Sequence, residues 1–208
     1  YLTDGLAEPY GGLVAKYWTG AGSDNALATA ANWVSNTVPS AASESFFDGV
    51  YLQEVNVTSA RTIRDFKVLD NAGPFVFSGE TVAFAYPASD TRTGGQPSVW
   101  DYSDFPVVVN NAMKNSVANR DVWALAFAQG SISLMGGSSG SDIRGFRFGG
   151  DIRLGGTWEI PAVWVAPQWS KSAARTSRLT VMPNATVTLT DQTNDIDVNE
   201  KGEAAFAV

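Results

Sequence analysis

Apolar residues recur at every second position in short bursts along most of the chain, and this pattern constrains the fold more than any other feature. Clear examples are the pairs Val55/Val57, Phe75/Phe77, Ile132/Leu134 and Ile152/Leu154. Alternation of this kind places the apolar side chains on one face of a β-strand. Turn-forming residues such as Gly, Asn, Asp and Pro separate the bursts. The sequence therefore predicts an all-β fold made of many short strands.

Short alternating strands are compatible with a sandwich, a barrel or a β-solenoid. The spacing favours the solenoid. The pair that begins at Val55 precedes the one at Phe75 by 20 residues, and Ile132 precedes Ile152 by the same interval. One coil of a triangular β-solenoid takes roughly 18–25 residues. Helical spacing is weak everywhere except within residues 26–33, where one or two helical turns are expected.

Two residue types, histidine and cysteine, are absent from the chain. Their absence excludes disulfides, the usual zinc sites and nucleophiles activated by histidine. The chain carries 14 Lys plus Arg against 21 Asp plus Glu, a net charge of −7. This balance argues against nucleic acid and anionic membranes as partners. No run of apolar residues is long enough for a transmembrane helix, and we expect none.

A group of short motifs lies near the amino end. Residues 17–22 form the string Tyr-Trp-Thr-Gly-Ala-Gly, and Asn32-Trp33, Val38-Pro39 and the Phe-Phe-Asp-Gly of residues 46–49 follow it. This stretch resembles the opening of large secreted bacterial proteins built from autotransporter-associated β-strand repeats. The resemblance continues in strand-like segments along most of the chain. It implies a right-handed parallel β-helix that is extracellular or attached to the cell surface, and it implies no particular activity.

This resemblance divides the chain into two parts. Residues 1–48 are expected to form an N-terminal segment and cap, with Tyr17, Trp18 and Trp33 as an apolar plug. Residues 49–208 are expected to form the β-helix, which we predict to continue beyond Val208. Two long loop insertions, residues 86–105 and 161–178, interrupt the alternating pattern.

Aromatic residues in the two insertions form a candidate carbohydrate site. They are Tyr86, Trp100 and Tyr102 in the first insertion, and Trp164 and Trp169 in the second. Flat aromatic rings can cover the apolar C–H face of a sugar, so polysaccharide binding is one hypothesis and plain loop packing is the alternative. Asp101 and Asp104 lie beside these rings, but two carboxylates in one short loop are poorly placed to flank a glycosidic bond.

Oxygen-bearing side chains gather near the carboxyl end, at Asp191, Asp195, Asp197 and Asn199. Calcium takes many oxygen ligands, so a Ca²⁺ site is one hypothesis, and no other cofactor is expected. An EF-hand loop is excluded because Glu200 and Phe206 stand where its Gly and Glu belong. Because apolar residues alternate with these positions, the alternative is the solvated face of a strand.

Charged residues alternate with an apolar one in Asp142-Ile143-Arg144 and again in Asp151-Ile152-Arg153. β-Helix lyases can use a basic residue to remove a proton, but arginine is a reluctant base. We therefore interpret these residues as ion pairs on the outer face of a strand.

The function that the sequence predicts is that of an exported bacterial surface, adhesive or scaffold segment without catalytic activity. An outer face rich in Thr, Asn and Ser also suits self-association. The alternatives are a carbohydrate-binding module of a polysaccharide-active enzyme and, less favoured, a β-helix lyase or glycoside hydrolase.

Overall fold

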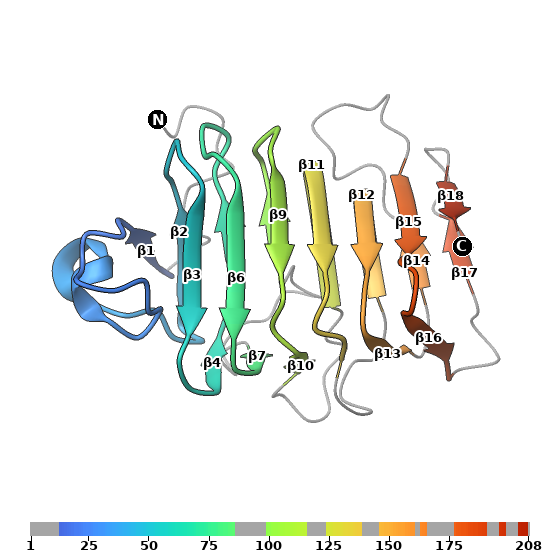
Figure 1. The fold of residues 1–208 in the computed structure, drawn as a ribbon, viewed down its shortest axis with the longest axis horizontal. Helices are drawn as coiled ribbons and strands as arrows, with labels where there is room; N and C mark the ends of the chain where they lie inside the picture. The colour runs from blue at the N-terminus through green and yellow to red at the C-terminus, as the bar shows by residue number, and fades with distance from the viewer. Residues whose placement is uncertain are drawn as a thin grey trace.

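The computed structural model describes residues 13–85, 99–115, 124–138, 146–160, 163–165, 177–190, 196–198 and 204–207 (Figure 1). Within these residues the chain is all-β, as the alternating pattern predicts, and its strands pair in parallel. Within residues 26–33, where helical turns are expected, the chain forms the short 3-10 helix η1 (Ala30–Asn32), and a second one, η2 (Val34–Asn36), follows that range. No helix among the described residues is long and apolar enough to cross a membrane.

A 13-stranded sheet dominates the fold and contains two runs of strands. The first run is β1 (Val14–Trp18), β2 (Ser43–Phe47), β5 (Phe66–Val68), β8 (Val99–Asp101), β11 (Ala124–Leu134), β12 (Phe146–Leu154), β14 (Val163–Val165) and β17 (Ile196–Val198). The second run begins with β3 (Gln53–Val57), β6 (Phe75–Gly79) and β9 (Pro106–Val109), passes through the later halves of β11 and β12, and ends with β15 (Ser177–Val181) and β18 (Ala204–Ala207).

Two smaller sheets complete the described strands. One contains β4 (Arg61–Ile63), β7 (Val82–Phe84) and β10 (Met113–Asn115), and the other contains β13 (Thr157–Ile160) and β16 (Thr186–Leu189). Strands β2 to β7 each pair with the strand three places later in the chain. The long strands β11 and β12 belong to both runs of the large sheet, and their mutual register shifts between Phe127 and Ser131. The large sheet is therefore curled rather than flat (Figure 1).

The core lies on the inner side of the curled sheet and consists of rows of side chains in register. One such row is Val55, Phe77, Val109, Leu134 and Leu154, all essentially inaccessible to solvent. The predicted 20-residue interval holds for the pair of Leu134 with Leu154. It is wrong for Val55, which pairs with Phe77 and not with Phe75, because the connection between β3 and β6 is longer.

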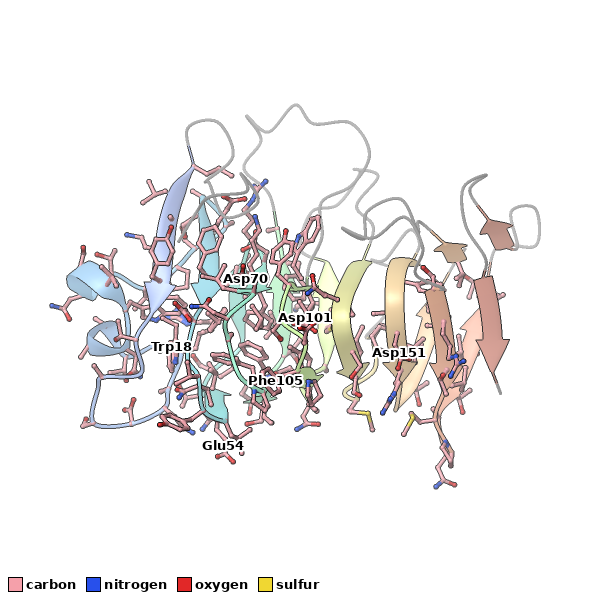
Figure 2. All side chains as sticks on the ribbon, turned by 90° about the horizontal axis from the view of Figure 1, so that it is seen from above. Trp18, Glu54, Asp70, Asp101, Phe105 and Asp151 are labelled. Carbon is pink, nitrogen blue, oxygen red and sulfur yellow. The ribbon has the colours of Figure 1, made fainter. Side chains whose placement is uncertain are left out.

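The amino-terminal motifs close one end of the core. The rings of Trp18 and Trp33 meet edge to face with centroids 5.2 Å apart, and Trp33 packs in the same way on Phe47 at 5.5 Å. Trp18 lies at the amino-terminal end of the row of strands (Figure 2). Tyr17, which we expected in the same plug, instead stacks on Phe46 on the opposite side of the sheet, because neighbouring residues of a strand point to opposite faces.

The predicted insertions are partly wrong, because both contain strands of the large sheet. Strand β8 lies between β5 and β11, while β14 and β15 both pair with β12. Strands β8 and β14 have three residues each, so their alternation is too short to distinguish them from a loop. Residues 86–98, 161–162 and 166–176 of these insertions lie outside the described residues.

Candidate functional site

The outer side of strands β2, β5 and β8 carries a polar cluster next to a pair of aromatic rings. Phe46, Lys67 and Trp100 occupy matching positions on these strands. The strand residues before and after Lys67 are Phe66 and Val68, which point into the core, so Lys67 points to the outer side. Lys67 is nevertheless only 8% exposed.

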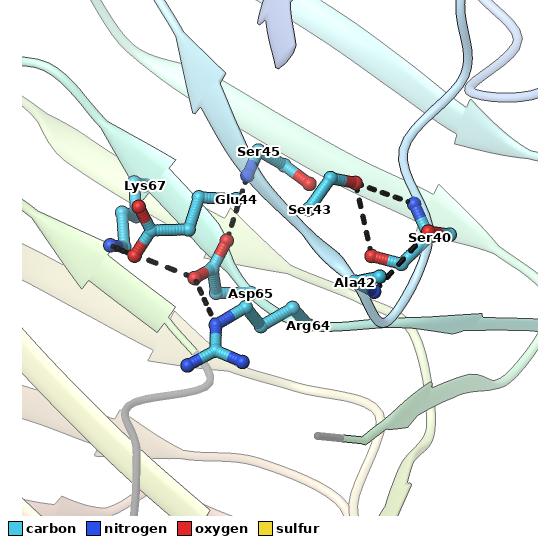
Figure 3. A network of polar contacts seen from close by, with 8 residues as sticks. All are labelled: Ser40, Ala42, Ser43, Glu44, Ser45, Arg64, Asp65 and Lys67. Atoms are coloured by element: carbon cyan, nitrogen blue, oxygen red, sulfur yellow. Dashed lines mark hydrogen bonds and ion pairs between the residues drawn. The ribbon is translucent and has the colours of Figure 1, made fainter. Parts of the chain in front are cut away.

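The polar cluster consists of four charged side chains, two acidic and two basic (Figure 3). The Nζ atom of Lys67 donates to Oε1 of Glu44 at 2.5 Å and lies 3.7 Å from Oδ2 of Asp65. The same Oδ2 atom lies 3.9 Å from Nε of Arg64, while Oδ1 of Asp65 accepts a hydrogen bond from the Ser45 backbone amide at 2.8 Å. These charges are buried and mutually compensated, as buried ionic groups generally are.

The surroundings of the cluster shift the pKa of Asp65. Burial raises the pKa of the Asp65 carboxyl to about 6, and the nearby Lys67 ammonium opposes that rise. Lys67 Nζ also lies 5.4 Å from the centroid of the buried Phe46 ring, a cation–π arrangement. The cluster is thus a set of charges held in a medium far less polar than water.

The structure brings together two of the five predicted carbohydrate-binding aromatics. The rings of Trp100 and Tyr102 stack with centroids 5.5 Å apart and an angle of 20° between their planes. A hydrogen bond from the Tyr102 backbone amide to the Val68 carbonyl, at 2.9 Å, fixes the chain just after β8. Tyr86 and Trp169 lie outside the described residues. Of Trp164 only the backbone is described, in β14.

Of the four predicted calcium ligands, the structure describes only Asp197. The backbone of Asp197 lies in β17, where it is in register with Trp164, so the alternating strand predicted there is present. Asp191, Asp195 and Asn199 lie outside the described residues. Within the part of the chain that is described, no three acidic side chains gather closely enough to hold a metal ion.

Asp101 and Asp104 occupy different surroundings. Oδ1 of the buried Asp101 accepts hydrogen bonds from the backbone amide and the hydroxyl of Ser103, at 3.0 and 2.7 Å. Burial raises the pKa of Asp101 to about 7, against the effect of these hydrogen bonds. Asp104 is exposed and accepts a hydrogen bond from Gln129. The two carboxyls therefore differ in burial and in hydrogen-bond partners.

Of the two Asp-Ile-Arg segments expected to form ion pairs, the one at 151–153 does so, and Asp142 and Arg144 lie outside the described residues. Arg153 Nη2 lies 3.2 Å from Oδ2 of Asp151, with both side chains partly exposed, and Ile152 between them is completely buried. Arg178, on the neighbouring strand β15, is the register partner of Asp151 and is exposed. These residues form a solvated charged surface.

Sequence reasoning missed the polar cluster. Lys67 alternates with the core residues Phe66 and Val68, a pattern that ordinarily indicates a solvated strand face, and Glu44 stands between two serines, where no apolar alternation marks its position. Only the pairing of β2 with β5 shows that the two charges meet. Comparisons with protein-family models, with curated proteins and with solved structures found no match to this chain.

Proposed function

We propose that the chain is a segment of an exported, right-handed parallel β-helix with a surface, adhesive or scaffold role and without catalytic activity. The observation that carries the proposal is the repeated pairing of each strand with the strand three places later, from β2 through β10. Three strands per coil is the arrangement of a triangular β-helix. Nearly all crossover connections between parallel strands are right-handed, which supports the assigned hand.

The regular spacing of the outer surface supports a scaffold role. Outward positions in the second run fall in register across six paired strands, at Glu54, Val76, Val108, Ser133, Arg153 and Thr180. A stack of coils with a continuous core displays such a row at fixed intervals and grows without changing its cross-section. That property suits a rod that carries surface groups away from a cell.

The absence of cysteine makes the coil arrangement directly measurable. Spin labels on Glu54→Cys and Thr180→Cys are separated by five steps between paired strands. At one interstrand spacing per step, the expected separation of the two backbones is about 24 Å. The matched control is a doublet at Glu54→Cys and Val108→Cys, two steps and about 10 Å apart. Distances that do not grow in proportion to the number of steps would contradict the β-helix.

Export is tested in the cells that make the protein. We expect the chain in the extracellular or surface-exposed fraction, where protease added to intact cells removes it. Recovery with cytosolic markers, in a form that added protease does not reach, would contradict the proposed location.

A second candidate function is carbohydrate binding at the Trp100–Tyr102 pair, favoured by the near-parallel stacking of two partly exposed rings. Electrophoresis through gels that contain neutral or uronate polysaccharides should retard the wild type. Trp100→Ala should abolish the retardation, while the control Tyr51→Ala, at an exposed turn, should not. Equal mobility of all three proteins in every gel would rule out this function for the pair.

A further inference from the structure

The contact between Lys67 and Glu44 joins an amine and a carboxyl that lie 23 residues apart in the sequence and on neighbouring strands. Glu44 belongs to β2 and Lys67 to β5, and Phe46 is the register partner of Lys67. The lysine side chain therefore reaches back along the outer side of β2 to the carboxyl two residues earlier. Both groups are buried, and the pair is set by the sheet rather than by a flexible loop.

We propose that Lys67 and Glu44 join in an intramolecular amide cross-link, with Asp65 as the group that moves the protons. The structure places all three groups in one buried cluster, with Asp65 Oδ2 3.7 Å from Lys67 Nζ (Figure 3). Such a bond is a covalent modification that the chain makes on itself, independent of whether it serves as a scaffold.

The reaction requires Lys67 as a neutral amine and Glu44 as a neutral acid, which one proton transfer across their hydrogen bond supplies. A desolvated, neutral lysine amine is a competent nucleophile towards a carbonyl carbon. The buried Phe46 ring, 5.4 Å from Nζ, forms one apolar wall of the cluster.

Asp65 is positioned to carry protons between the reacting groups. The Ser45 backbone amide holds its Oδ1 at 2.8 Å, which leaves Oδ2 on the side of Lys67. Burial brings the pKa of Asp65 to about 6, close to neutral pH, where a group both accepts and releases protons efficiently.

The reaction balances without an oxidant or an activating co-reactant. Proton transfer converts the ammonium and carboxylate of the ion pair into a neutral amine and a neutral acid. The Lys67 nitrogen then bonds to Cδ of Glu44, Asp65 accepts a proton from that nitrogen, and it returns a proton to the departing hydroxyl. A C–N bond forms, a C–O bond breaks, one water molecule leaves, and Asp65 ends in its initial state. Groups held in contact by a fold react as if at very high concentration.

Mass spectrometry of the intact chain tests the proposal. We expect the folded wild type to be lighter than its sequence by the mass of one water molecule. Trypsin should then fail to cleave after Lys67 and should release residues 17–61 joined to residues 65–92 as one branched peptide. Wild type of full sequence mass after prolonged incubation at neutral pH overturns the proposal, whatever the variants do.

Three variants separate the roles of the residues. Lys67→Arg removes the nucleophile and should have full mass, and Asp65→Asn should also have full mass although it retains both reacting groups. The exposed Glu54→Gln is the matched control and should lose water as the wild type does. Circular dichroism establishes that each variant is folded. A cross-link that forms at the wild-type rate in folded Asp65→Asn would overturn the role of Asp65.

Discussion

Two buried carboxyls, Asp65 and Asp101, give single residues an unusual influence on the stability of this acidic protein. In the unfolded chain both titrate near 3.8, whereas in the folded protein burial raises their pKa values to about 6 and about 7. Between the unfolded pKa of 3.8 and the folded pKa values of about 6 and about 7, the folded protein binds more protons than the unfolded chain does. The free energy of unfolding therefore decreases as the pH rises through this range.

We predict that the protein is more stable to urea at about pH 5 than at about pH 8, since one unit of pKa shift corresponds to about 1.4 kcal/mol. Asp101→Asn cannot ionise, and its amide oxygen can still accept the Ser103 hydrogen bonds. This variant should show a shallower pH dependence, measured as urea midpoints across the range. A midpoint that rises with pH in the wild type would contradict the prediction.

The buried Asn32 explains why the amino-terminal motif pairs its asparagine with glycine. Its Oδ1 accepts a hydrogen bond from the Gly22 amide at 2.7 Å, and its Nδ2 donates to the Ala26 carbonyl at 2.9 Å. A Cβ at Gly22 would lie 2.5 Å from that Oδ1 atom, so a larger residue would displace it. The sequence shows that the motif contains Gly22 and Asn32. It does not show that they touch, because that contact exists only in the folded chain.

Asn32→Ala should lower the free energy of unfolding by about 2–4 kcal/mol, because it leaves a buried donor and a buried acceptor without partners. The exposed Asn25→Ala is the control and should change stability by less than about 0.5 kcal/mol. Chemical denaturation measures both. Equal effects of the two substitutions would show that the buried amide does not hold the cap together.

At the scale of elements, the sequence predicted long strands better than short ones. The alternation of Ile132 with Leu134 marks β11, and the two residues occupy the expected inward positions. Strand β8 has only three residues, with Trp100 on its outer side, so its pattern could not be distinguished from a loop. The polar cluster could not be predicted either, because alternation gives the face of each residue but not the register between strands.

The bend within β12 depends on Gly150. Its φ angle is +84°, and a Cβ there would lie 2.0 Å from the Ala128 carbonyl oxygen. We expect Gly150→Ala to lower the free energy of unfolding by at least about 2 kcal/mol, since both the backbone angle and the contact are unfavourable. At Gly49 the nearest neighbour of a Cβ is the flexible Gln53 side chain at 3.1 Å, so Gly49→Ala is the milder control in the same denaturation assay.

At the scale of the whole molecule, one cluster of buried apolar residues extends from Trp18 to Leu179. We therefore predict a single thermal transition, followed by circular dichroism in the far ultraviolet. Phe77→Ala removes a fully buried ring that contacts Phe47, Phe66 and Phe75, and it should cost about 3–5 kcal/mol.

The control for that substitution is its neighbour in the same strand. Val76 points to the outer side and is only half-buried, so Val76→Ala should cost much less. Two separate transitions, of which Phe77→Ala shifts only one, would show that the amino- and carboxyl-terminal halves unfold independently.

The short distance along the chain between sheet partners gives folding a direction. Val55 meets Phe77, 22 residues later, and Leu134 meets Leu154, 20 residues later, so each strand needs only a segment of chain made shortly before it. A polypeptide that emerges amino end first from a ribosome can add every new strand to an edge that already exists. The closed end around Asn32 and Trp33 would be complete at the start of that process. Each added strand covers the edge before it, so backward slippage of the chain becomes harder with every strand that pairs.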